Sequence, residues 1–375
     1  MNQQQVQEKI NRHLSFLAQD ENNLKLLIEI SDLYSEAEEL EKAQMYLDKA
    51  NLIDQDACLG HQGLLYLNQG KLQEAQNCFI KALSYGDTPA LRYNLGFTYY
   101  ITFDFEKAWE VLAPTLQGEH YPEAKLLMAR ILHRQDSINE AIELINQVLE
   151  QNPEDAEALG LLALLYFDLN EDKLAEKNSQ LALKIDADNY DARLVSVLLR
   201  LITQETTVEE IEDLIQVNSQ DSRLWFALGN TYMIQGEMDK AEQNLQKAIE
   251  IYPDFYDCHI VLAWCQLLND RIDEAHATYL TATQIVDEIA DAWGGLGLIA
   301  ALQEDFLKAE QLITKAKNLN PECFLTQVAD AIYYNHKNPA KAKRNLVKAL
   351  TATKVPVSQQ LAFIIEEIEN SQQVH

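Results

Sequence analysis

The sequence is poor in glycine and proline, the residues that most often interrupt regular structure. Only twelve glycines and eight prolines occur among 375 residues, and no low-complexity or linker-like tract separates one part of the chain from another. Apolar residues make up 47% of the chain, enough for an extensive core. This composition favours a mostly helical protein.

Long apolar runs are also missing. No window approaches the roughly 20 apolar residues that a membrane helix needs. The first residues, MNQQQVQEKINRHLSF, contain no apolar stretch behind a basic flank, as a secretory signal would. We therefore expect no secretory signal and no direct insertion into a membrane.

Basic residues are scarce. The chain has 30 basic and 59 acidic residues, a formal net charge of -29. Such a surface repels phosphate backbones and anionic lipids, so nucleic acid is not expected as a partner. Two interpretations of the acidic surface stay open: a coat that keeps the protein soluble, or a preference for basic partners.

Cysteine is present in a pattern that argues against a disulfide framework. The five cysteines are odd in number and contain no closely spaced pair: Cys58, Cys78, Cys258, Cys265 and Cys323. This pattern is typical of a reducing compartment, and we expect a cytoplasmic protein.

What the chain does contain is a repeat of about 33 residues. An alanine marks it at Ala43, Ala75, Ala108, Ala141, Ala175, Ala241, Ala275, Ala309 and Ala342. A second small residue usually follows this marker alanine by seven positions, and a glycine or alanine usually precedes the marker by twelve positions. The gap between Ala175 and Ala241 is twice as long as the others, so one repeat there has lost its marker.

The repeat resembles the tetratricopeptide repeat, whose pattern is W-x2-L-G-x2-Y, then A-x3-F, then P. The stretch from Trp225 to Tyr232 matches the first half without a gap, and Trp293 to Gly297 matches nearly as well. The resemblance implies an all-α fold, a right-handed superhelix (α-α solenoid) of antiparallel helix pairs. Small residues such as Gly229, Ala241 and Ala248 would then let paired helices approach closely.

The repeat register divides the chain into five segments. We expect an N-terminal capping helix over 1–23, repeats one to five over 24–189, a degenerate repeat six over 190–221, repeats seven to ten over 222–355, and a C-terminal capping helix and tail over 356–375. In repeat six, Glu209 stands where alanine is expected and Arg200 where tyrosine is expected. A drifted repeat that still packs and a hinge between two arms are both open interpretations.

In this family the first helices of successive repeats line the concave side, where ligands usually lie. The helix ALRYNLGFTYYI in repeat three is apolar on more sides than stacking requires. The same register predicts a mostly apolar groove lined by Tyr93, Phe97, Tyr100, Leu126, Leu164, Phe167, Phe226, Asn230, Met233, Trp264 and Leu267. Gly60, Gly160 and Gly294 are expected to leave room in it. Packing of some of these side chains between first helices is the alternative.

Three polar side chains interrupt the predicted groove: Arg130, His133 and Arg134. They could receive a carboxylate of a partner, or nearby acidic residues could neutralise them. The carboxylate clamp of chaperone-binding relatives is absent, because the equivalent positions hold Ile28, Asp32, Gly60, Leu64, Tyr93 and Phe97.

Nothing in the sequence indicates catalysis. The eight histidines are scattered without metal-ligand spacing, and no P-loop, dinucleotide-binding turn or nucleophile elbow occurs. We expect no enzyme activity, no metal and no cofactor.

We expect instead a scaffold or adaptor that captures an extended or helical segment of another protein, apolar or basic in character. Assembly of a bacterial secretion, pilus or envelope complex is one setting, with recruitment to a membrane-associated complex. A self-associating homodimer and a regulatory peptide sensor acting through a separate effector chain are the alternatives.

Overall fold

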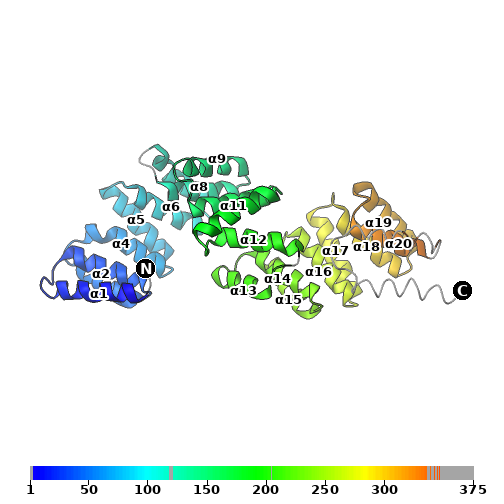
Figure 1. Ribbon diagram of the computed structural model, residues 1–375, viewed down its shortest axis with the longest axis horizontal. Coiled ribbons are helices and arrows are strands. Elements are labelled where there is room, and N and C mark those ends of the chain that lie inside the picture. Colours follow the sequence, from blue (N-terminus) through cyan, green and yellow to red (C-terminus); the bar gives the residue numbers. More distant parts are fainter. Residues whose placement is uncertain are drawn as a thin grey trace. The chain divides into compact units, whose positions relative to one another are not determined.

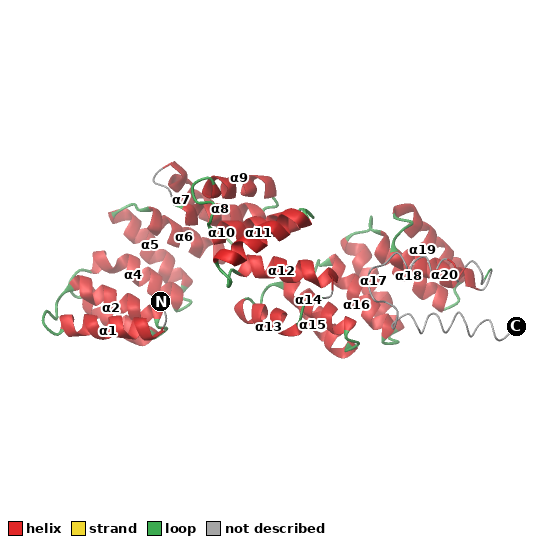
Figure 2. Ribbon diagram, viewed as in Figure 1, coloured by secondary structure: helices red, strands yellow, loops and turns green. Residues whose placement is uncertain are grey.

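The computed structural model describes residues 3–117, 121–203 and 205–335, together with the single residues 338, 342, 344 and 346. Over this part of the chain the regular elements are helices joined by short loops, as Figure 2 shows. The expected all-α fold of helix pairs is therefore confirmed.

The chain divides into two compact units, Met1–Ala192 and Arg193–His375. The boundary falls near the start of helix α12 (Tyr190–Thr203), which is the first helix of repeat six. Hydrophobic clusters lie within each unit. A hinge at repeat six stays a prediction.

The first unit contains α1 to α11, coloured blue to green in Figure 1. Their bounds are α1 Gln3–Leu17, α2 Leu24–Glu36, α3 Leu40–Asn51, α4 Gln55–Asn68, α5 Leu72–Tyr85, α6 Pro89–Ile101, α7 Phe105–Leu112, α8 Pro122–Arg134, α9 Ile138–Leu149, α10 Ala156–Asp168 and α11 Asp172–Ile185. A short 3-10 helix, η1 Ala113–Gln117, follows α7.

The second unit contains most of α12 and α13 to α20. Their bounds are α13 Val208–Val217, α14 Ser222–Ile234, α15 Met238–Ile251, α16 Tyr256–Leu268, α17 Ile272–Ile285, α18 Ala290–Leu302, α19 Phe306–Leu319 and α20 Phe324–Asn335. The C-terminal helix expected over 356–375 lies outside the described residues.

Within each unit the helices alternate between the first and the second helix of a repeat. A first helix such as α4 packs against the second helix of its own repeat, α5, and the second helix packs against the next first helix, α6. The marker alanines explain the close pairing, since Ala43, Ala75 and Ala241 are completely buried. At the N-terminal end, α1 packs on α2 and buries Val6 and Ile10.

Glycines in the first helices let large side chains of the second helices come close. A Cβ added at Gly63 would lie 2.5 Å from the ring of Phe79, and one at Gly229 would lie 2.6 Å from Cγ of Leu245. Side chains of the second helix therefore fill the space that each glycine leaves. The packing role predicted for Gly229 is confirmed.

Two of the three glycines expected to leave room in the groove have a different role. A Cβ at Gly160 would overlap Oδ1 of Asn189, and one at Gly294 would lie 2.7 Å from the backbone nitrogen of Thr326. At Gly60 the nearest atom is Cδ2 of Leu91, at 3.3 Å. Gly160 and Gly294 are buried, face the following repeat and admit its close approach. The expectation that these two leave a groove open is therefore wrong, whereas for the half-buried Gly60 it stays a prediction.

Repeat six also differs from its expected register. The buried residues of α13, Ile211 and Leu214, have the spacing of Leu245 and Ala248 in α15. Thr207 then stands at the alanine position, and it caps α13 through the backbone nitrogen of Glu210. At 10 residues, the second helix of this repeat is about one turn shorter than α15, which has 14. Glu209 is exposed because it lies two residues beyond the marker.

Candidate functional site

A pocket of about 420 Å³ lies in the first unit, between α6, α8 and the start of α10. It is lined by Tyr93, Phe97, Tyr100, Pro122, Glu123, Leu126, Leu127, Arg130, Asp155 and Glu157. Five of the side chains predicted from the sequence therefore meet here, contributed by two successive repeats. The volume lies at the lower end of the range of ligand pockets, roughly 300–1,000 Å³.

One wall of the pocket belongs to a row of aromatic rings along α6. The rings of Tyr93 and Phe97 are stacked, with centroids 6.2 Å apart, since residues four apart lie on one helix face. Tyr100 continues the row to Phe105 at 5.8 Å, and Phe105 contacts Phe103 at 6.1 Å. We call these five residues the aromatic strip.

Phe103, at the end of the strip, is a bulky residue in a left-handed turn. It has φ of 61° in the turn after α6, and its surface is 74% exposed. The equivalent turns of the other repeats hold the same left-handed position with Glu38, Gly70, Asp136, Asn170, Gly236, Asp270 or Glu304. The conformation is therefore a regular feature of the repeat, and what sets Phe103 apart is a bulky aromatic side chain, which tolerates this conformation less well than glycine or asparagine.

Sequence reasoning missed Phe103 and Phe105 as site residues. The sequence did contain a signal for Phe103, because the repeat register aligns the turns that join the two helices of each repeat. A phenylalanine then stands where other repeats have glycine, asparagine or an acidic residue. A short exposed turn gives such a side chain no core to fill.

The polar side chains of α8 are paired with carboxylates of the following repeats. An Nη2 hydrogen of Arg130 is donated to Oδ2 of Asp191 at 2.7 Å, and the same nitrogen contacts Glu157. His133 Nε2 lies 2.6 Å from Oδ2 of Asp168. Neutralisation, the alternative interpretation, therefore describes Arg130 and His133, whereas Arg134 is exposed.

The electrostatic setting of the pocket is acidic. Burial raises the pKa of Tyr93, and the neighbouring Tyr121, Glu157 and Glu123 raise it further. A raised tyrosine pKa means that negative charge on the ring is disfavoured there. Burial, the larger cause, and the neighbouring carboxylates both disfavour a negative charge at Tyr93.

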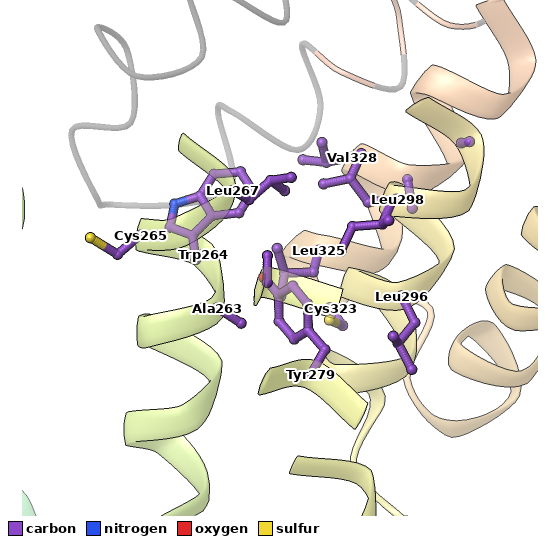
Figure 3. Packing of buried hydrophobic residues seen from close by; sticks show 14 of the residues in the cluster. Ala263, Trp264, Cys265, Leu267, Tyr279, Leu296, Leu298, Cys323, Leu325 and Val328 are labelled. Atoms are coloured by element: carbon purple, nitrogen blue, oxygen red, sulfur yellow. The ribbon is translucent and has the colours of Figure 1, made fainter. Parts of the chain in front are cut away.

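Four other predicted residues are buried: Leu164, Met233, Trp264 and Leu267. Figure 3 shows Trp264 and Leu267 among the apolar side chains of the second unit. The ring of Trp264 meets that of Phe324, two first helices further on, at 6.0 Å. This arrangement matches the alternative of packing between first helices. Gly294 permits it because α20 approaches α18 backbone to backbone.

The remaining predicted residues are half-buried. Phe226 packs against Phe255, with ring centroids 5.0 Å apart, and Asn230 donates to the carbonyl oxygen of Phe226 at 3.1 Å. Phe167 lies on α10, in the other unit. None of these three residues lines the pocket, and their role in binding stays a prediction.

A second, more open pocket of about 370 Å³ lies between α15, α16 and α17. Its lining includes Gln246, His259 and Thr281 but none of the predicted side chains. Over the described part of the chain no group of three or more His, Cys, Asp or Glu side chains is arranged to hold a metal. No helix there is long and apolar enough to cross a membrane.

Comparison with known proteins agrees with the repeat architecture. A relative named anaphase-promoting complex subunit 3, from Schizosaccharomyces pombe, is 28% identical over 198 residues, which cover 52% of this chain and 30% of the relative. The BBSome complex member BBS4 of Mus musculus is 32% identical over 160 residues, 42% of this chain and 31% of that protein. The chain spans less than a third of the length of the first curated relatives it matches.

Among solved structures, the APC/C hetero-tetramer Cut9-Hcn1 aligns with 93% of this chain and 83% of that chain, at 15% identity and a TM-score of 0.44. Models of the tetratricopeptide repeat match residues 58–85, 102–165, 156–189, 222–255 and 261–322. Together these matches cover more than half of the sequence. The chain belongs to the tetratricopeptide repeat family.

Proposed function

We propose that this protein is a non-enzymatic scaffold that captures a segment of another protein on the aromatic strip and the adjoining pocket. The observation that carries the proposal is the continuity of the two. Tyr93, Phe97 and Tyr100 line the pocket, and the ring contacts run on from Tyr100 to the exposed Phe103. Partly exposed aromatic side chains that adjoin a pocket are typical of partner sites.

The size of the pocket indicates how a partner would bind. A helix with its side chains is about 10–12 Å across, so two turns of it occupy roughly 1,000 Å³. The pocket, at about 420 Å³, is smaller than that. It accommodates one or two side chains of the partner, while the rest of the segment lies over the aromatic strip.

Complex assembly is the setting that we propose. Two matched relatives carry the names of complex subunits, anaphase-promoting complex subunit 3 and BBSome complex member BBS4. A bacterial secretion, pilus or envelope assembly is another setting of this kind. The five cysteines are free thiols, four of them buried, which supports a reducing compartment such as the cytoplasm.

Peptide selection tests the proposal and requires no identified partner. A displayed library of random peptides is selected on the full chain, and the binders are synthesised with a fluorophore for anisotropy. We expect Phe97→Ala to weaken binding at least tenfold, about 1.4 kcal/mol. Phe16→Ala is the matched control, because Phe16 is 49% exposed in α1 and lies outside the aromatic strip.

Circular dichroism shows whether each variant folds. Since Phe97 is partly buried against its neighbours, Phe103→Asn provides a second variant whose exposed side chain has no core role. Binders that neither substitution affects would overturn the proposal.

A further inference from the structure

The rim of the pocket carries carboxylates at the point where the aromatic wall ends. Glu123 is the second residue of α8, Asp155 caps α10 through the backbone nitrogen of Ala158 at 3.0 Å, and Glu157 lies in the first turn of α10. Glu123 and Glu157 are exposed. A ligand that fills the pocket therefore meets aromatic faces and acidic side chains together.

Arg130 is the basic side chain in this lining, and its charge is already engaged. It contacts Glu157 and donates to the buried Asp191, whose side chain is 7% exposed. Carboxylates thus outnumber the guanidinium around the pocket. The net charge of the whole chain, -29, adds to the negative potential there.

We propose that the pocket takes the cationic end of a lysine or arginine side chain of the partner segment, an inference that rests on the proposed function. The aliphatic stem of such a side chain lies along Phe97 and Leu126, as long basic side chains do on apolar surface. The charged end reaches Tyr93 and the carboxylate of Glu123. A cation beside an aromatic ring is attracted by the electrons of the ring.

The same surroundings reject the opposite charge. A carboxylate in the pocket would face Glu123, Asp155 and Glu157. The positive charge of Arg130 is already shared between Asp191 and Glu157, so it offsets this repulsion only in part. This site therefore prefers a cationic group, whereas a carboxylate clamp binds an anionic one.

The test uses the strongest peptide whose binding depends on Phe97. We expect this peptide to contain a lysine or arginine, and we expect its replacement by glutamine or norleucine to weaken binding about tenfold. Glu123→Gln should weaken the basic peptide three- to tenfold and leave the glutamine peptide unchanged. Glu140→Gln is the matched control, an exposed acid in the first turn of α9.

The outcomes separate the two proposals. Phe97-dependent peptides that contain no basic residue, or that norleucine substitution does not weaken, would contradict the cation site and leave the proposed function standing. An equal effect of Glu123→Gln on both peptides would also contradict it. Peptides that bind without any dependence on Phe97 would overturn both.

Discussion

Arg130 and Asp191 are 61 residues apart in the sequence, and a guanidinium nitrogen of the first donates to a carboxylate oxygen of the second at 2.7 Å. Glu157 contacts the same nitrogen. One arginine of α8 thus joins the first helices of two later repeats, α10 and α12. Nearest-neighbour stacking is the usual source of stability in solenoids, and this contact reaches one repeat further.

Removal of this arginine should destabilise the first unit. Arg130→Gln leaves Asp191 buried without its charged partner, and we expect a loss of about 2–3 kcal/mol. This is less than the 3–5 kcal/mol of a fully buried pair, because 27% of the Arg130 side chain is exposed. Urea unfolding measures the loss. Arg134→Gln, on the same helix but exposed, should change stability by no more than about 0.5 kcal/mol.

A double-mutant cycle with Asp191→Asn isolates the pair. If Arg130→Gln costs as much in the Asp191→Asn background as in the natural chain, the ion pair does not stabilise the unit.

Replacement of the exposed Phe103 should raise the stability of the protein and lower its affinity for peptides. Phe103→Asn removes a bulky side chain from a left-handed conformation, and asparagine already occupies that conformation at Asn170, with φ of 58°. We expect a gain of about 1 kcal/mol in stability and weaker capture of selected peptides. Thermal unfolding and anisotropy measure the two effects.

The reverse exchange, Asn170→Phe, provides the control, and we expect it to lower the melting temperature. A melting temperature that falls in Phe103→Asn would show that Phe103 packs in the native state and is not a strained contact residue.

Two glycine-to-alanine substitutions should have opposite effects on the free energy of unfolding. The Cβ of Gly294→Ala meets the backbone nitrogen of Thr326 at 2.7 Å, and a backbone atom cannot move aside. We expect a loss of about 1–3 kcal/mol from this overpacking. At Gly60→Ala the neighbour is the end of the Leu91 side chain at 3.3 Å. That side chain can shift, so the helix propensity of alanine should stabilise α4 by up to about 1 kcal/mol.

Circular dichroism during heating compares the two variants with the natural chain. Equal destabilisation by both would mean that α18 and α20 approach no more closely than α4 and α6 do.

Buried thiols should make the second unit sensitive to alkaline pH. Burial raises the pKa of Cys265 to about 11 and that of Cys258 to about 12, with nearby Asp239 and Asp257 adding to the effect. An unfolded cysteine has a pKa of about 8.5. The folded state therefore binds these protons more tightly, so its advantage is fully present below about pH 8.5 and is lost as pH rises toward 11.

Melting temperatures between pH 8 and 10.5 check this expectation. The decline should be shallower in the variant Cys258→Ala with Cys265→Ala than in the natural chain, because tyrosine ionisation is common to both. Parallel declines would show that these thiols do not contribute.

The side chains predicted to line a groove have different surroundings in the two units, for a physical reason. Phe97 and Trp264 have the same kind of position on a first helix, but their neighbours differ. Around Phe97 the next first helix presents Glu123 and Arg130 at a distance that leaves a pocket. Around Trp264, the glycine-rich α18 admits α20, and Phe324 fills the space.

Local periodicity determined the helix pairs, the repeat register and the packing role of residues such as Gly229 and Ala241, because these depend on contacts within about one repeat of sequence. Tertiary structure alone decided which side chains of the first helices line a pocket and which are packed against another helix. Asp191 reaches Arg130 across two repeats and Phe324 reaches Trp264 across two others. Contacts between residues two repeats apart depend on the distance between neighbouring helices, and the sequence of a single repeat does not determine that distance.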